Sequence, residues 1–121
     1  MGQALKILIA DDDKSFRDEL MLALSLRGYE VRGAGNGALA MRSLEDFAAD
    51  ILLTDWLMPE MDGIELIRAV QVRWPNTKIV AISSGGSMDW PTLARTAGAF
   101  GVHQVLQKPV NIGDLIQTIG K

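Results

Sequence analysis

The chain has 121 residues, a formal net charge of −3 and no cysteine, and 48% of its residues are hydrophobic. This length suits one domain, which we expect to cover residues 1–121. The composition excludes disulfides and thiolate metal sites, and the lack of a Lys/Arg cluster argues against a nucleic-acid partner. No stretch approaches the roughly 20 apolar residues of a membrane span, so we expect a cytoplasmic protein without a membrane partner.

Five short apolar runs recur along the chain, each about as long as a strand. They lie at residues 5–10, 29–34, 51–54, 79–82 and 102–106. Most of them are almost continuously hydrophobic, which is typical of strands that are covered on both faces. We therefore expect these runs to form the strands of a buried parallel sheet.

The segments between these runs carry helical patterns. In the first, apolar residues recur at steps of three and four from Phe16, and Gly28 is a candidate C-cap. Asn36 is a candidate N-cap for a second helix. Further helices are expected at residues 63–74, at residues 89–99 and from about residue 111. Alternating strands and helices predict an α/β fold, an open parallel sheet with helices on both faces.

Polar side chains follow four of the five predicted strands. Asp11, Asp12 and Asp13 end the first strand, Asp55 the third, Ser83 and Ser84 the fourth, and Lys108 the fifth, whereas the second ends in Gly33-Ala34-Gly35. In open parallel sheets, ligands bind beyond the carboxyl ends of the strands. One polar residue at a strand end can arise by chance, but four strands that deliver them to one edge predict a site.

The chemistry of this set is limited. Oxygen ligands suit a hard cation such as Mg²⁺, and an aspartate can act as a nucleophile toward phosphorus. Lys108 can pair with a carboxylate or a phosphoryl oxygen, and Ser83 can donate a hydroxyl hydrogen bond. The residues fit phosphoryl transfer to an aspartate better than hydrolysis through a Ser-His pair. His103 is the only histidine, and we interpret it as a surface or structural residue.

Four fragments together resemble a known family. "ILIADDDKS", "LLTDWLMPEMDGIEL", "IVAISS" and "VLQKPV" are similar, in order and spacing, to the receiver domain of two-component response regulators, and most of all to stand-alone receivers of the chemotaxis type. The resemblance covers essentially the whole chain. It implies a flavodoxin-like (βα)5 three-layer sandwich with a five-stranded parallel sheet in the order 2-1-3-4-5.

The resemblance also assigns roles in metal binding. Asp55 looks like the phosphoacceptor and a metal ligand. Asp11 and Asp12 match the acidic pair that holds Mg²⁺, and the backbone carbonyl of Leu57 would be a further ligand. Asp13 matches a position where the family is not strict, and we expect it to point to solvent or to cap the first helix.

Ser83 and Lys108 complete the implied site. Ser83 matches the Ser/Thr that hydrogen-bonds the phosphoryl group, and Lys108 matches the lysine that pairs with the acidic site, with an expected cis bond between Lys108 and Pro109. The chain departs from the pattern in three places, one of which is the pair Leu57 and Gly85, where side chains of the family tune dephosphorylation. Val105 stands where such receivers carry a switching aromatic residue, and a longer segment around Trp90 follows Ser83.

The resemblance implies a single-domain response regulator that accepts a phosphoryl group on Asp55 from a sensor histidine kinase or a phosphotransfer protein. It would signal to a downstream protein, unknown from the sequence, and act only on itself rather than as an enzyme with external substrates. Alternatives are a phosphorelay intermediate, a receiver cut from a larger regulator, a phosphate-independent interaction module and a Mg²⁺-dependent phosphatase with an Asp nucleophile. The sequence does not predict the oligomeric state.

Overall fold

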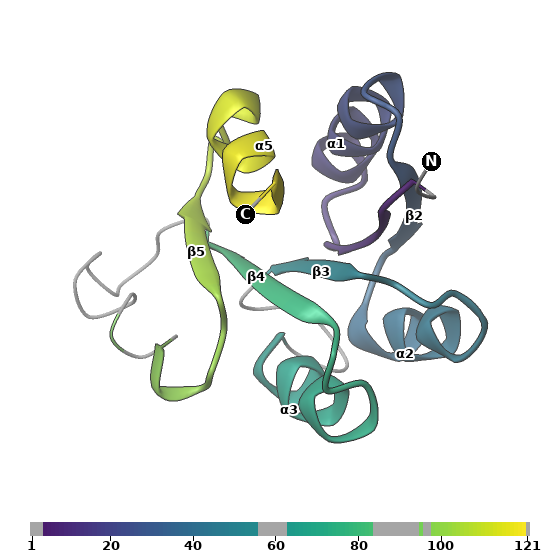
Figure 1. The fold of residues 1–121 in the computed structure, drawn as a ribbon, viewed down its shortest axis with the longest axis vertical. Coiled ribbons are helices and arrows are strands. Elements are labelled where there is room, and N and C mark those ends of the chain that lie inside the picture. The colour runs from purple at the N-terminus through teal and green to yellow at the C-terminus, as the bar shows by residue number, and fades with distance from the viewer. Residues whose placement is uncertain (1–3, 56–62, 84–94, 96–97, 121) are drawn as a thin grey trace.

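The computed structural model describes residues 4–55, 63–83, 95, 98 and 99, and 100–120. Five parallel strands form one sheet in the order β2-β1-β3-β4-β5, which confirms the expected fold (Figure 1). The strands are β1 Lys6–Ala10, β2 Glu30–Ala34, β3 Ile51–Asp55, β4 Lys78–Ser83 and β5 Gln104–Gln107. The helices with described bounds are α1 Lys14–Leu26, α2 Gly37–Asp46, α3 Gly63–Arg73 and α5 Ile112–Gly120. Most of the helix expected at residues 89–99 lies outside the described residues.

The sheet separates two hydrophobic cores because successive strand residues point to opposite faces. In β1, Ile7 and Ile9 pack with residues of α1 and α5, whereas Leu8 and Ala10 pack with residues of α2 and α3. Figure 1 shows α1 and α5 on one side of the sheet and α2 and α3 on the other. This burial on both sides accounts for the almost continuous apolar runs in the sequence.

The ends of the helices follow the capping signals of the sequence. The Asn36 side chain accepts a hydrogen bond from the Leu39 N–H at 2.8 Å, and Asn111 accepts one from the Asp114 N–H at 3.0 Å. Gly28 follows the C-cap of α1 with φ +93°, a conformation that glycine adopts without strain. The predicted cap at Asn36 is therefore confirmed, whereas the C-cap of α1 is Arg27, one residue before the predicted Gly28.

The start of β5 differs from the expectation by two residues. His103, which was expected inside or just before this strand, precedes it and has an exposed side chain. Its Nδ1 accepts a hydrogen bond from the Ile79 N–H at 3.0 Å, and its own N–H donates to the Ile79 carbonyl at 2.9 Å. The imidazole therefore takes the place of a backbone acceptor, which confirms a structural role for His103.

In the described part of the chain, no helix has the length and apolar character needed to span a bilayer.

Candidate functional site

Three aspartates meet at the carboxyl edge of the sheet. Each of Asp11, Asp12 and Asp55 offers an oxygen, and these oxygens all lie within 4.8 Å of one another. The pairing of β1 with β3 brings Asp11 and Asp55 together. Ala10 pairs with Thr54, and an aspartate follows each of these two residues. Asp11 is completely buried and Asp55 is 7% exposed, whereas Asp12 is exposed. The acidic cluster predicted from the strand ends is therefore present.

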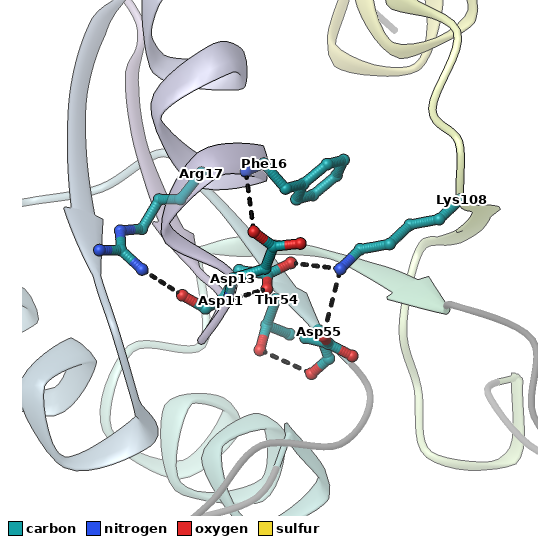
Figure 2. A network of polar contacts seen from close by, with 7 residues as sticks. All are labelled: Asp11, Asp13, Phe16, Arg17, Thr54, Asp55 and Lys108. Carbon is teal, nitrogen blue, oxygen red and sulfur yellow. Dashed lines mark hydrogen bonds and ion pairs between the residues drawn. The ribbon is translucent and has the colours of Figure 1, made fainter.

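Lys108 directly follows β5, and its side chain extends toward Asp11 and Asp55 (Figure 2). Its Nζ lies 3.0 Å from Asp11 Oδ2 and 3.5 Å from Asp55 Oδ2, and its side chain is 18% exposed. The Lys108 N–H donates to the Ser83 carbonyl at 2.7 Å, which extends the pairing of β4 and β5 by one residue. The peptide bond between Lys108 and Pro109 is cis, as expected.

The ammonium group of Lys108 stays protonated in these surroundings. Burial by itself lowers the pKa of this lysine, but the contact with the Asp11 carboxylate and the charges of Asp11 and Asp55 outweigh burial, so the pKa is raised above its ordinary value. Three carboxylates and one ammonium give the cluster a formal charge of −2. Such an excess of negative charge at short range favours the binding of a further cation.

The two oxygens of Asp11 differ in their partners. Oδ1 accepts a hydrogen bond from the Asp13 N–H at 2.9 Å. Oδ2 is buried and accepts no hydrogen bond from the described residues, although Lys108 lies at ion-pair distance. Apart from this ammonium, the buried Oδ2 has no donor among the described residues, and Mg²⁺ binds carboxylate oxygens of this kind. The residues present therefore fit the expected Mg²⁺.

Asp13 is the local residue of the acidic run. Its side chain caps α1 by accepting a hydrogen bond from the Phe16 N–H at 3.1 Å (Figure 2). The capping role expected for Asp13 is confirmed, and Asp13 is not among the three residues whose carboxylates converge.

Ser83 and Val105 lie on the last two strands of the sheet. Ser83 ends β4, one residue beyond the residue that pairs with Asp55, and it is 5% exposed. Val105 of β5 pairs with Ala81 and is buried in the core on the α2 and α3 side of the sheet. The position of the expected aromatic switch is therefore occupied by an aliphatic core residue.

Two residues of α1 that the sequence interpretation did not assign to the site also contact it. The Lys108 Nζ lies over the Phe16 ring, 4.2 Å from the ring centroid. Arg17 Nη1 donates a hydrogen bond to the Asp11 carbonyl, which Figure 2 marks with a dashed line. Phe16 was interpreted only as one position of an apolar helical pattern. Its place three residues after the helix cap, directly beside the acidic run, is the signal that points to the site.

The Arg17 side chain packs against the end of β2. A side chain added at Gly33 would place its Cβ 3.0 Å from Arg17 Cδ and 2.7 Å from Met21 Sδ. The guanidinium lies close to Gly35, where an added Cβ would be 3.7 Å from Nη1. Glycine at position 33 therefore leaves the space that the Arg17 and Met21 side chains of α1 occupy.

Four positions discussed above lie outside the described residues. These are Leu57, whose carbonyl was expected to bind Mg²⁺, and Ser84, Gly85 and Trp90 in the segment that follows β4.

Comparison with known proteins agrees with the resemblance noted in the sequence. The family model of the response regulator receiver domain matches residues 7–120. The response regulator receiver protein CpdR of Brucella abortus is 39% identical over 116 residues, which are 96% of this chain and 94% of CpdR. The DNA-binding transcriptional regulator NtrC of Azospirillum brasilense is 33% identical over 116 residues, and this chain spans only 24% of its length.

Solved structures show the same architecture. A response regulator receiver protein from Pseudomonas putida superposes with a TM-score of 0.87 at 25% identity, covering 99% of this chain and 98% of that one. The chemotaxis protein CheY4 of Vibrio cholerae superposes with a TM-score of 0.86 at 28% identity, covering 97% of each chain. With the family model over nearly the whole chain, this protein belongs to the response regulator receiver domain family.

Proposed function

We propose that this receiver domain accepts a phosphoryl group on Asp55 in a Mg²⁺-dependent reaction. The donor is a phosphorylated histidine of a sensor kinase or of a phosphotransfer protein. The observation that carries the proposal is the convergence of Asp55 with Asp11, Asp12 and the Lys108 ammonium at one edge of the sheet. Each of these groups has a task in phosphoryl transfer that it would not have in a merely structural cluster.

The reaction begins at the carboxylate of Asp55. One carboxylate oxygen attacks phosphorus, the bond from phosphorus to the donor nitrogen breaks, and the electron pair of that bond stays on the donor imidazole. Asp11, Asp12 and Asp55 would hold a Mg²⁺ ion, which would supply positive charge to offset that of the phosphoryl oxygens. The Lys108 ammonium and the Ser83 hydroxyl are the groups of the chain that interact with the transferred oxygens.

Signalling follows from the change in charge. An aspartyl phosphate brings additional negative oxygens to an edge where Lys108 already contacts two carboxylates. Lys108 then redistributes its contacts, and the altered edge is recognised by a downstream protein. Val105 is a small aliphatic core residue, so this output does not pass through rotation of an aromatic ring at that position.

In this function, residues 1–121 act as one cytoplasmic receiver domain that modifies only itself. A phosphorelay intermediate uses the same chemistry and differs only in passing the phosphoryl group to another histidine. Phosphatases with an aspartate nucleophile typically carry an acid two residues later, and here that residue is Leu57. This leucine favours the receiver function over turnover of external phosphomonoesters.

The test is phosphorylation with acetyl phosphate, followed by intact-mass spectrometry. Wild-type protein should gain at most one phosphoryl group per chain in Mg²⁺ and none in excess EDTA. Asp55→Asn should gain none, whereas the matched control Asp13→Asn should label as wild type, because asparagine also caps helices well. Labelling of Asp55→Asn at the wild-type level would contradict the proposal. Sustained release of phosphate from diverse monoesters would favour the phosphatase instead.

A further inference from the structure

We infer that Phe16 is a positioning residue for Lys108: its ring holds the ammonium over the acidic edge and so strengthens the binding of phosphoryl oxygens at Asp55. The inference rests on the proposed function of that edge. It assigns a role in the site to a residue of α1 that neither binds the metal nor accepts the phosphoryl group.

The position of the ring is fixed by its surroundings. Phe16 lies in the first turn of α1, where its N–H donates to the Asp13 cap at 3.1 Å. Its side chain is half-buried and packs against the core on the α1 and α5 side of the sheet. The cap fixes the backbone and the core fixes the ring, so Phe16 is a preorganised support rather than a mobile surface residue.

The Lys108 ammonium lies between this ring and the carboxylates. Its Nζ is 4.2 Å from the Phe16 ring centroid, 3.0 Å from Asp11 Oδ2 and 3.5 Å from Asp55 Oδ2. Figure 2 shows the ring and the two carboxylates grouped around the ammonium. The contacts come from α1, from the end of β1 and from the end of β3, and together they leave the lysine side chain 18% exposed.

An aromatic ring suits this place for two physical reasons. The negative face of the ring attracts a cation without accepting its proton or competing for the metal. The ring also excludes water from one side of the ammonium, which strengthens the attraction between the ammonium and the oxygens on the other side. An aliphatic residue at position 16 would fill similar space but would lack the attraction, and the end of the long lysine side chain would then be held by the two carboxylates alone.

The experiment measures binding of beryllium fluoride, a phosphoryl mimic, in the presence of Mg²⁺ by isothermal titration calorimetry. Phe16→Leu should weaken this binding about threefold to tenfold, the range that a partly buried cation–π contact predicts. Phe16→Tyr, which keeps the ring, should bind within about twofold of wild type. In a Lys108→Met background, Phe16→Leu should cause no further loss, because the residue on which the ring acts is gone.

Two results would overturn the inference. One is wild-type affinity in Phe16→Leu. The other is an equal loss in the Lys108→Met background, which would assign Phe16 a packing role that is independent of the lysine. If wild-type protein binds no beryllium fluoride at all, the proposed function fails. A second measurement then tests separately whether the Phe16 ring contacts the Lys108 ammonium.

That measurement is the NMR chemical shift of the Lys108 ε-methylene protons in metal-free protein. A ring face close to the ammonium shifts these protons upfield of an ordinary lysine. The shift should be present in wild type and Phe16→Tyr and lost in Phe16→Leu, while the backbone amide spectrum beyond α1 stays unchanged. Ordinary lysine shifts in wild type would overturn the inference whether or not the protein accepts phosphate.

Discussion

The carboxyl edge of the sheet at Asp11, Asp55 and Lys108 (the site edge) and the outer surface of α1 each hold an ion pair, and the two pairs differ much more in burial than in length. Lys14 and Asp18 lie 2.7 Å apart on α1, with side chains 78% and 53% exposed. Lys108 and Asp11 lie 3.0 Å apart, with side chains 18% and 0% exposed. Water and side-chain entropy cancel most of the attraction in an exposed pair, whereas a buried charge depends on its partner. The longer contact is therefore the more important one for the molecule.

The two regions also differ in charge balance. The exposed pairs of the described residues, such as Arg32 with Asp46 at 3.2 Å and Arg73 with Glu45 at 3.3 Å, join one cation to one anion. At the site edge, one lysine faces three carboxylates. A surface pair with one cation and one anion has no net charge, whereas the net negative charge of the site edge attracts a further cation. Substitutions in these two regions should therefore differ in effect, and the largest effect is expected at the site edge.

Removal of the site lysine should have the largest effect on the stability of metal-free protein. Lys108→Met keeps much of the apolar stem but leaves Asp11 and Asp55 without their cation. The free energy of unfolding should fall by about 3 kcal/mol, near the lower end of the range for a broken buried pair because the ammonium keeps some contact with water. Urea denaturation measures this loss. An unchanged midpoint and slope would show that the site edge behaves like an exposed pair.

Magnesium should stabilise the protein by binding to the folded site edge. At a Mg²⁺ concentration about a hundred times the dissociation constant, the free energy of unfolding should rise by about 2.7 kcal/mol. Asp12→Ala should lose most of this increase in urea denaturation with and without Mg²⁺, because it removes one of the three converging carboxylates.

Asp13→Ala is the neighbouring control for this measurement. Loss of the α1 cap should lower the free energy of unfolding by about 1 kcal/mol in both conditions, but the Mg²⁺ increase should remain. Equal Mg²⁺ responses in Asp12→Ala and Asp13→Ala would contradict the assignment of Asp12 to the metal and of Asp13 to the helix.

Alkaline pH should reduce the difference between wild type and Lys108→Met. The pKa of Lys108 is raised in the folded protein, mainly by Asp11 against the opposing effect of burial, so the folded state holds this proton more tightly than the unfolded state. The contribution of the ammonium is complete below the ordinary lysine pKa of 10.5 and is lost as pH rises through the higher folded value. The free energy of unfolding of both proteins, measured from about pH 8 upward, should show a decreasing difference between them. A difference that stays constant with pH would contradict this prediction.

The smallest effect is expected for the exposed pair. Lys14→Met applies the same substitution to the shorter of the two ion pairs. The pKa of Asp18 is lowered chiefly by its hydrogen bond with Lys14, so the pair is lost as pH falls through the acidic range. At neutral pH the urea midpoint should not change measurably, because both groups remain well hydrated. A loss as large as that of Lys108→Met would refute the ranking by burial.

Much of the fold could be predicted from the sequence because burial on both sides of a parallel sheet leaves a direct pattern of apolar runs. The strand ends likewise identified Asp11, Asp12, Asp55 and Lys108 as neighbours, because the carboxyl ends of parallel strands share one edge. Distances between these groups were not predictable, since they depend on the register of the strands.

The contributions of Phe16 and Arg17 were not predictable from the same patterns. A helical period shows which face of α1 meets the core, but it does not show which residue of another strand end lies above a given ring or guanidinium. Lys108 is 92 positions from Phe16 in the chain, and β3 and β4 lie between β1 and β5 in the sheet. The sequence shows that β2 ends without charged or hydroxyl residues, but it does not show that Arg17 packs against Gly33 there.

The contact between Arg17 and the end of β2 has an evolutionary consequence. A side chain at position 33 and a long side chain at position 17 compete for the same space, as the 3.0 Å approach of an added Cβ to Arg17 Cδ shows. Relatives with a larger residue at the position of Gly33 should therefore carry a shorter residue at the position of Arg17, and these two positions should covary. Receivers that lose this arginine would have to hold the backbone at the first aspartate by other means.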